Sequence, residues 1–291
     1  MFKGSMAALV TPMQDDGKVD FDALEELVFF HIKNQTDALV LLGTTAESPT
    51  LTKIEKQQIV TNTLNQVAGK MPIMVGVGTN ATTTTVDNVK QMTSLGVDGL
   101  LIISPYYNKP TQEGLYQHFM MAADATHLPV ILYNHVGRTG VDIQPTTAAR
   151  LAKASNITGL KETVSVERAQ EVLQLTNKLD IFCGDDPVNL QMLQAGAKGI
   201  ISVTANVTPK ALHDMCAAYA NGDHSTAEAI HKQLSPLHKE LGLETNPIPV
   251  KWALNYLDLI PPGIRLPLTP LSEEYHQNII NALQMAGVLG E

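Results

Sequence analysis

The sequence contains few cysteines. Only Cys183 and Cys216 are present among 291 residues, and neither belongs to a CxxC pair or has a histidine at zinc-ligand spacing. Disulfide frameworks and structural zinc sites both depend on several cysteines at short, regular spacings. We therefore expect neither a disulfide framework nor a structural zinc site. The protein is expected in a reducing compartment.

Long apolar runs are also missing from the sequence. The N-terminal stretch MFKGSMAALVTPM reaches Pro12 after an apolar run that is too short for a secretory signal. No segment approaches the roughly 18 consecutive apolar residues that a membrane-spanning helix needs. These two observations predict a soluble, cytoplasmic protein that has no membrane partner.

Basic residues are fewer than acidic ones. The chain has 20 Lys and Arg against 29 Asp and Glu, which gives a formal net charge of -9, and the basic residues form no runs. Proteins that bind nucleic acid or anionic membranes usually carry a basic patch or stripe. Small molecules or other proteins are therefore the expected partners. A hydrophobic fraction of 44% is sufficient for a large core.

Short apolar runs recur along the chain, and each is followed by a segment with helical periodicity. There are eight of them, at residues 5–10, 38–43, 72–78, 99–104, 129–134, 157–162, 179–184 and 199–203. Nearly continuous apolar runs of this length are typical of parallel strands that helices cover. The pattern predicts an α/β fold, a closed (β/α)8 TIM barrel over residues 1–222.

The same pattern bears on an alternative fold and on the part of the chain that follows the predicted barrel. An open doubly wound sheet usually has fewer strands, and its GxGxxG fingerprint does not follow the first apolar run. After residue 222 the helical pattern continues without strands, at residues 225–241, 246–257 and 272–287. We predict a C-terminal helical extension over residues 223–291.

Lys161 lies at the end of the sixth apolar run, in the stretch ITGLKE. With a period of two it shares a strand face with Gly159, which would leave room for a ligand beside it. One interpretation is a lysine that extends along the surface to water. The other is an amine held away from water, which can attack a ketone and form a Schiff base. Glu162, on the opposite face, is interpreted as a polar strand end.

Polar side chains follow other predicted strands, and a barrel of this kind places catalytic groups at the carboxyl ends of its strands. Tyr133 is either a core aromatic or part of a hydroxyl chain with Thr44 and Tyr107 that moves protons. Thr45 is either a turn residue or part of a carboxylate site. Arg138 is either a surface residue or the group that binds a second carboxylate.

Two aspartate pairs are the candidates for metal binding. Asp15–Asp16 and Asp185–Asp186 each lack a further histidine or carboxylate at useful spacing. Loop and helix-cap roles are therefore predicted for them. No metal site is assigned, and none of the scattered histidines is given a catalytic role.

Six motifs occur in order along the chain: GTTAES, SPYYNKP, YNHVGRTG, GLKE, ISVTAN and NPIPVK. With them the chain resembles, essentially from end to end, the dihydrodipicolinate synthase family of pyruvate-dependent Schiff-base lyases and aldolases. The resemblance implies condensation of pyruvate with L-aspartate 4-semialdehyde to 4-hydroxy-tetrahydrodipicolinate, the first committed step of lysine and diaminopimelate biosynthesis. It also implies that no metal or organic cofactor is needed.

The resemblance implies catalytic roles for four residues. Lys161 matches the Schiff-base lysine of the family, and Tyr133 matches the tyrosine that donates and accepts protons. Thr44 and Tyr107 match its proton relay. In related synthases the equivalent of Tyr107 crosses a dimer interface, so the resemblance implies a homo-oligomer, most often a tetramer built as a dimer of dimers.

Substrate-binding roles are implied for three further residues. Thr45 and Ile201 match the pyruvate site of the family. Arg138 matches the arginine that receives the carboxylate of aspartate semialdehyde.

Two alternative functions stay open. The first is an N-acetylneuraminate lyase or a 2-keto-3-deoxy sugar acid aldolase of the same family, although those enzymes generally lack an arginine at the position of Arg138. The second is a non-catalytic barrel that binds a keto acid. Such a binder would need neither an amine nucleophile nor a relay of hydroxyl groups.

The chain departs from the family pattern at several positions. Ala46 stands where a glycine is usual, which costs about 1 kcal/mol if that position needs a positive φ. Val136 stands where a proline is common, which leaves the loop that presents Arg138 less rigid.

Feedback inhibition by lysine is a separate expectation. In lysine-inhibited members the inhibitor pocket uses residues that match Ser48, Pro49, Asn80 and Tyr106. Those members also have a histidine and a glutamate in this pocket, at the positions where this chain has Lys56 and Thr84. An added positive charge and a lost negative charge both oppose a cationic ligand, so weak or absent inhibition is predicted.

Overall fold

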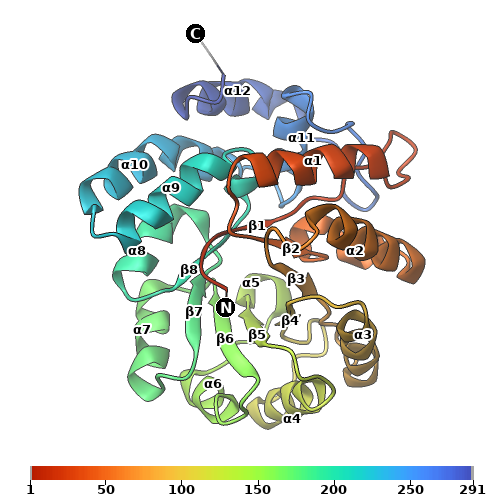
Figure 1. The fold of residues 1–291 in the computed structure, drawn as a ribbon, viewed down its shortest axis with the longest axis vertical. Helices are drawn as coiled ribbons and strands as arrows, with labels where there is room; N and C mark the ends of the chain where they lie inside the picture. Colours follow the sequence, from red (N-terminus) through yellow and green to blue (C-terminus); the bar gives the residue numbers. More distant parts are fainter. Residues whose placement is uncertain (1, 290–291) are drawn as a thin grey trace. The chain divides into compact units, whose positions relative to one another are not determined.

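The computed structural model describes residues 2–289. Its parallel strands form a closed barrel whose order around the barrel is the order along the chain, as labelled in Figure 1. The strands are β1 Gly4–Ala8, β2 Ala38–Leu41, β3 Ile73–Gly76, β4 Gly99–Ile103, β5 Val130–Asn134, β6 Ile157–Glu162, β7 Asp180–Cys183 and β8 Gly199–Ser202. Each predicted apolar run overlaps one of them, and only β1 begins outside its run, one residue earlier at Gly4. The predicted barrel is confirmed, and the open doubly wound sheet is wrong.

Helices alternate with the strands and continue after the last one. The α-helices are α1 Phe21–Lys33, α2 Lys53–Val67, α3 Thr82–Ser94, α4 Gln112–Ala123, α5 Val136–Thr139, α6 Pro145–Leu151, α7 Val166–Leu175, α8 Asn189–Gln194, α9 Pro209–Ala220, α10 His224–Glu240, α11 Ile248–Tyr256 and α12 His276–Met285. The 3-10 helices are η1 Thr44–Ala46, η2 Ser48–Thr50, η3 Asp186–Val188, η4 Thr204–Asn206 and η5 Glu273–Tyr275. The three helices predicted beyond residue 222 are confirmed as α10, α11 and α12.

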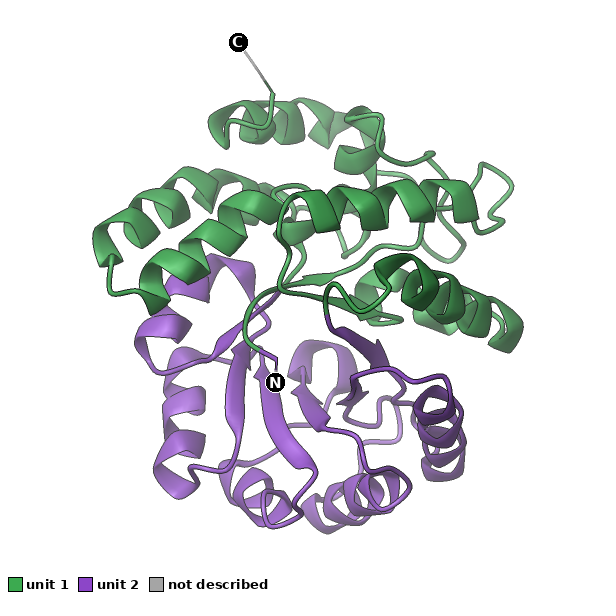
Figure 2. Ribbon diagram, in the orientation of Figure 1, with its two compact units in different colours: residues 1, 3–71, 202–291 green, residues 2, 72–201 purple. Residues whose placement is uncertain are grey.

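The chain separates into two compact units, shown in green and purple in Figure 2. Unit 1 contains residues 3–71 and the residues from Ser202 onward, and unit 2 contains Phe2 and residues 72–201. The predicted division of the sequence at residues 222 and 223 stays a prediction.

Unit 2 is a row of parallel strands with helices on their outer side, as Figures 1 and 2 show for α3, α4, α6 and α7. Its strands are buried because their side chains are apolar on both faces. Leu132 and Leu160 on one face have no exposed surface, and Ile131 on the other face is 1% exposed. In the β5–β6 register, Tyr133 pairs with Lys161 and Asn134 pairs with Glu162. This register determines which side chains of the two strands lie next to each other.

Unit 1 combines the first two strands with helices from both ends of the chain. Strands β1 and β2 pair in parallel, and α9 packs against both β1 and α10. Helix α2 begins with a capping box, in which the Thr52 hydroxyl accepts a hydrogen bond from the Glu55 backbone N–H and the Glu55 carboxylate accepts one from the Thr52 backbone N–H. The start of α2 is therefore well defined, after the 3-10 helix η2 that begins at the last residue of the GTTAES motif.

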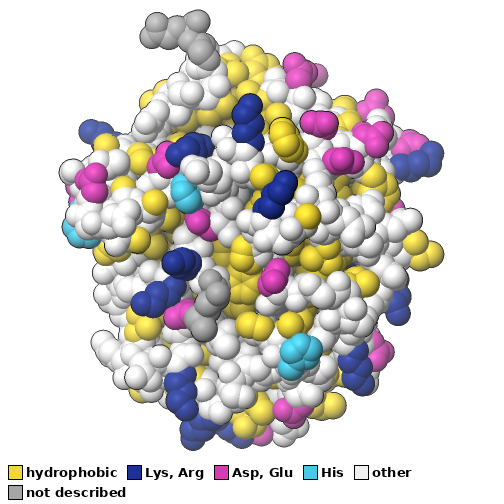
Figure 3. All heavy atoms as spheres, viewed as in Figure 1, with side chains coloured by type: hydrophobic (Ala, Val, Ile, Leu, Met, Phe, Trp, Pro, Cys, Tyr) yellow, Lys and Arg dark blue, Asp and Glu magenta, His cyan; other side chains and the backbone are white. Residues whose placement is uncertain are grey.

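Charged side chains are distributed over the surface. On the face shown in Figure 3, basic and acidic side chains are scattered among uncharged ones. Within residues 2–289, the structure has no helix that is long and apolar enough to cross a membrane.

Candidate active site

Lys161 and Tyr133 are neighbours at the carboxyl ends of β6 and β5. The Nζ atom of Lys161 lies 4.3 Å from the centroid of the Tyr133 ring, and the two residues are 6% and 5% exposed. A protonated amine in this position is attracted by the π face of the ring, and a neutral one packs against it. The interpretation of Lys161 as a lysine that extends to water is wrong, because its side chain is buried. The structure thus brings together the predicted nucleophile and the predicted proton carrier.

Gly184, at the end of β7, makes room for the Lys161 side chain. A Cβ atom at residue 184 would lie 2.5 Å from Lys161 Cε and 2.6 Å from Thr163 Cγ2. The expectation that Gly159 leaves room for a ligand is wrong, because a Cβ atom there would lie 2.7 Å from Cε2 of the Phe182 ring. Gly159 allows the core to pack, and Gly184 allows the lysine to occupy its position.

Behind this pair, Asn134 and Glu162 form a second, fully buried pair of side chains. The Asn134 amide donates to Glu162 Oε2 at 3.2 Å and to Asp142 Oδ1 at 2.8 Å. Glu162 Oε1 accepts hydrogen bonds from the backbone N–H groups of Thr163 and Val164, each at 2.8 Å. Both side chains are inaccessible to solvent, so the polar strand end at Glu162 is buried. Since they directly follow Tyr133 and Lys161 in their strands, these bonds hold the two strand ends in register.

The protonation of Glu162 is linked to folding. Burial raises the pKa of its carboxyl group above the ordinary 4.5, although the donors from Val164, Asn134 and Thr163 act in the opposite direction. A carboxyl group whose pKa is raised in the folded state binds its proton more tightly there than in the unfolded chain. Its contribution to stability is therefore present below the ordinary pKa and is lost as the pH rises through the folded pKa.

We expect the Glu162→Gln variant to lack this pH dependence. As the pH rises from 4.5 toward neutrality, the melting temperature of the unmodified protein should fall relative to that of the variant. A pH-independent offset between the two melting temperatures does not affect this trend. Thermal unfolding at a series of pH values measures this. Glu113→Gln is the matched control, because Arg150 holds the pKa of that exposed carboxyl below its ordinary value and the trend there should be small and opposite. A pH-independent difference for Glu162→Gln would contradict the prediction.

His135, which follows β5, lies against Tyr133. The two rings meet edge to face with centroids 5.9 Å apart. Burial, together with the positive charges of Arg138 and Lys161, lowers the pKa of His135 to about 4, so the imidazole is neutral at pH 7. No histidine was predicted to be catalytic from the sequence, and His135 draws attention because its ring lies against that of Tyr133.

The remaining predicted residues of unit 2 lie at the ends of strands or in the segments that follow them. Arg138 is exposed on α5, a single helical turn that begins at Val136, where a helix tolerates proline and valine alike. Tyr107, after β4, is 89% exposed and has a φ of 74°. Ile201 is buried in β8.

Thr44 and Thr45 begin the 3-10 helix η1 in unit 1. Thr45 is 3% exposed, and its Oγ1 atom accepts a hydrogen bond from the Asn246 amide at 3.0 Å. The positive φ of this turn, 55°, falls at Glu47 and not at Ala46. The alanine in place of the usual glycine therefore causes no backbone strain, which answers the question that this departure raised.

The aspartate pairs make local contacts. Asp16 accepts from the Lys18 backbone N–H at 3.0 Å, and Asp186 accepts from the Asn189 amide at 2.8 Å. The Asp16 contact agrees with the predicted loop role. At the other pair, η3 begins after Asp185 without a side-chain cap hydrogen bond, so the predicted cap role is not observed there. Across residues 2–289, no three or more His, Cys, Asp and Glu side chains are grouped in a way that could hold a metal ion.

The family model described as "Dihydrodipicolinate synthetase family" matches residues 1–286. The chain belongs to this family. It is 49% identical over 289 residues to a 4-hydroxy-tetrahydrodipicolinate synthase of Coxiella burnetii and 48% identical over 291 residues to one of Pseudomonas aeruginosa. These alignments cover 99% of this chain and 99% and 100% of those proteins. The resemblance predicted from the six motifs is confirmed.

Solved structures of the dihydrodipicolinate synthetase family have the same fold. The chloride-inhibited dihydrodipicolinate synthase of Acinetobacter baumannii, solved in complex with pyruvate, matches with a TM-score of 0.97 and 44% identity over 99% of this chain and 100% of that chain. The Thermotoga maritima enzyme matches with a TM-score of 0.96 and 42% identity over the same shares of the two chains.

Proposed function

We propose that this member of the dihydrodipicolinate synthetase family condenses pyruvate with L-aspartate 4-semialdehyde through a Schiff base on Lys161. Near full-length identity to 4-hydroxy-tetrahydrodipicolinate synthases supports the reaction and the enzyme class of lyase. The observation that carries the residue assignment is the buried Lys161 amine, 4.3 Å from the ring centroid of Tyr133. A passive keto-acid binder would have no use for a buried nucleophile next to a phenol.

The chemistry starts with the neutral Lys161 amine, which attacks the ketone carbon of pyruvate and forms an imine with loss of water. Removal of a proton from the pyruvate methyl group gives an enamine. The C=C electron pair of the enamine forms the new carbon–carbon bond to the aldehyde carbon, the nitrogen lone pair restores the C=N imine, and the aldehyde oxygen takes up a proton and becomes a hydroxyl group. The amine of the semialdehyde then adds to the imine carbon, closes the ring and displaces Lys161. In this scheme the Tyr133 hydroxyl carries protons between these intermediates, with Thr44 and Tyr107 as the relay.

The substrate carboxylates need their own partners. Thr45 and Ile201 are proposed to form the pyruvate site. Arg138 is proposed to bind the carboxylate of the semialdehyde, because a guanidinium can bind it through two parallel hydrogen bonds. This requirement separates the proposed reaction from the cleavage of long polyhydroxy acids by sugar acid aldolases.

Borohydride reduction in the presence of pyruvate tests the Schiff base. Reduction converts the imine to a stable secondary amine, and peptide mass spectrometry should find the pyruvate-derived adduct on Lys161. A protein without an adduct there would refute the assignment. A second assay compares condensation of pyruvate and aspartate semialdehyde with cleavage of N-acetylneuraminate, and faster cleavage would favour the alternative enzyme of the same family.

Tyr107 supports a homo-oligomer, which is proposed to be a tetramer built as a dimer of dimers. A tyrosine with positive φ stores backbone strain on the order of 1–3 kcal/mol, and here it places an aromatic ring almost fully in solvent. A second copy of the chain that covers the ring would offset this cost. Sedimentation velocity measures the assembly, and a monomer at enzymatic concentrations would refute the proposal. A cytoplasmic location also stays a prediction.

L-lysine is expected to inhibit this enzyme weakly or not at all. Lys56 replaces the histidine of lysine-inhibited family members, and Thr84 replaces their glutamate, so the local charge opposes a cationic ligand. The measurement is the initial rate of condensation at rising L-lysine concentration. Inhibition at micromolar L-lysine would show that other residues supply the binding energy.

A further inference from the structure

Glu47 and Lys251 form a buried ion pair that the reaction scheme does not use. Lys251 Nζ lies 2.5 Å from Glu47 Oε1, and the side chains are 4% and 1% exposed. The second carboxylate oxygen of Glu47 accepts the backbone N–H of Arg265 at 3.0 Å. Burial lowers the pKa of Lys251, while the charge and hydrogen bond of Glu47 act in the opposite direction. An ion pair buried in this way restricts the positions of both Glu47 and Lys251.

Glu47 occupies the turn that ends the GTTAE sequence. Its φ of 55° and ψ of 34° are left-handed, and its backbone N–H donates to the Thr44 carbonyl at 3.1 Å. This conformation costs a residue with a side chain about 1–2 kcal/mol. The two bonds to the Glu47 carboxylate anchor the residue in this conformation, which closes the 3-10 turn that contains Thr44 and Thr45.

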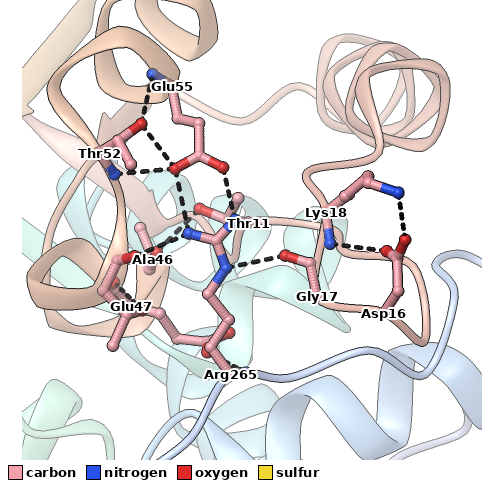
Figure 4. Close-up of polar contacts among 10 residues, drawn as sticks. Thr11, Asp16, Gly17, Lys18, Ala46, Glu47, Thr52, Glu55 and Arg265 are labelled. Atoms are coloured by element: carbon pink, nitrogen blue, oxygen red, sulfur yellow. Dashed lines mark hydrogen bonds and ion pairs between the residues drawn. The ribbon is translucent and has the colours of Figure 1, made fainter.

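Further contacts join the same turn to the C-terminal part of unit 1. Asn246 donates to the Thr45 hydroxyl, as described above. The Arg265 guanidinium donates to the carbonyl of Thr50 at 2.7 Å. It also donates to the carbonyl of Gly17 at 2.8 Å and to the Glu55 carboxylate, as Figure 4 shows. The segment from Asn246 to Arg265 therefore contacts the chain between Thr45 and Glu55 at several points.

We propose that the Glu47–Lys251 ion pair positions the Thr44–Thr45 turn, and that helix α11 thereby sets the affinity for the keto-acid carboxylate. The inference rests on the proposed function, in which Thr45 belongs to the pyruvate site. Lys251 acts through Glu47 and the turn, so it is a positioning residue and touches no substrate. Removal of Lys251 leaves a buried carboxylate without its partner, and the turn must then move to solvate it.

The Lys251→Met variant tests this role, because methionine keeps the unbranched chain and removes the charge. The pyruvate concentration that gives half-maximal borohydride-trapped adduct should rise about tenfold or more, as expected for a binding group displaced by a fraction of an ångström. The KM for pyruvate should rise in parallel, while the KM for aspartate semialdehyde stays nearly unchanged. Lys210→Met is the matched control, since Lys210 pairs with Asp214 at the surface of α9. It should leave both values unchanged.

The double variant Glu47→Gln/Lys251→Met separates positioning from stability. It leaves no unpaired buried charge, so its melting temperature should recover toward that of the unmodified protein. Its half-saturating pyruvate concentration should stay raised, because the ion pair that fixes residue 47 is still missing. If both charge variants fail to fold, Asn246→Ala removes an uncharged donor to Thr45, and the same rise in half-saturating pyruvate is expected.

Two outcomes would overturn one conclusion each. A folded Lys251→Met, double or Asn246→Ala variant with unchanged half-saturation by pyruvate would refute the positioning role and leave the reaction untouched. Absence of any pyruvate adduct in the unmodified protein would instead refute the Schiff-base function, irrespective of the variants.

Discussion

Lys161→Met is expected to lower kcat by on the order of 10⁴-fold or more, because it removes the only group that forms the covalent intermediate in the proposed scheme. Methionine approximates the length of the lysine side chain and can pack against the Tyr133 ring, so the fold should be retained. The measurement is the initial rate of condensation with both substrates saturating. Borohydride reduction with pyruvate should leave no adduct on the variant.

Lys178→Met provides the control for this experiment. Lys178 is exposed, and it lies after α7 in the same compact unit as Lys161. Its replacement removes one lysine without touching the strand ends, and both activity and adduct should be unaffected. Residual activity in Lys161→Met within a factor of about ten of the unmodified enzyme would mean that condensation proceeds without the covalent step.

Tyr133→Phe is expected to lower kcat by about 10²- to 10⁴-fold, the usual effect of losing a positioned acid–base group. Phenylalanine keeps the ring that lies 4.3 Å from Lys161 Nζ and removes only the hydroxyl. The pyruvate adduct should therefore still form on Lys161, more slowly than in the unmodified enzyme. Comparison of the trapping rate with kcat separates imine formation from turnover.

A matched aromatic substitution elsewhere serves as the control. Tyr256→Phe removes a hydroxyl from a 44% exposed tyrosine on α11. It should change neither kcat nor the rate at which the pyruvate adduct is trapped. If Tyr133→Phe retained a kcat within about threefold of the unmodified value, the proton carrier would have to be another group, and the neutral His135 beside it would be the first candidate.

The strands were predictable because each is a short apolar run between polar turns. Burial on both faces removes the alternation of apolar and polar residues that half-exposed strands show. The strands are therefore identified by the length of each apolar run. The resemblance to the family assigned Lys161 and Tyr133, and the sequence placed them at the ends of neighbouring strands. Their side-chain contact follows from the β5–β6 register, which no local pattern specifies.

Features that depend on contacts between distant segments were not predictable. The role of Gly184 depends on where the Lys161 side chain lies across the β6–β7 pairing. Lys251 and Glu47 are 204 positions apart, so neither residue type nor spacing indicates that they pair. Gly159 was misinterpreted for the same reason, since the space beside it is filled by Phe182 from the next strand.

The alternation at the ends of β5 and β6 has a consequence for how the sequence can change. Tyr133 and Lys161 form one cross-strand pair, and the next residue of each strand forms the buried Asn134–Glu162 pair on the other side. Deletion of a single residue in either strand would place Glu162 or Asn134 where the reacting groups stand, and insertion of one would place Leu160 or Leu132 there. Length variation in this family should therefore be confined to the loops, and these two dipeptides should vary only as a unit.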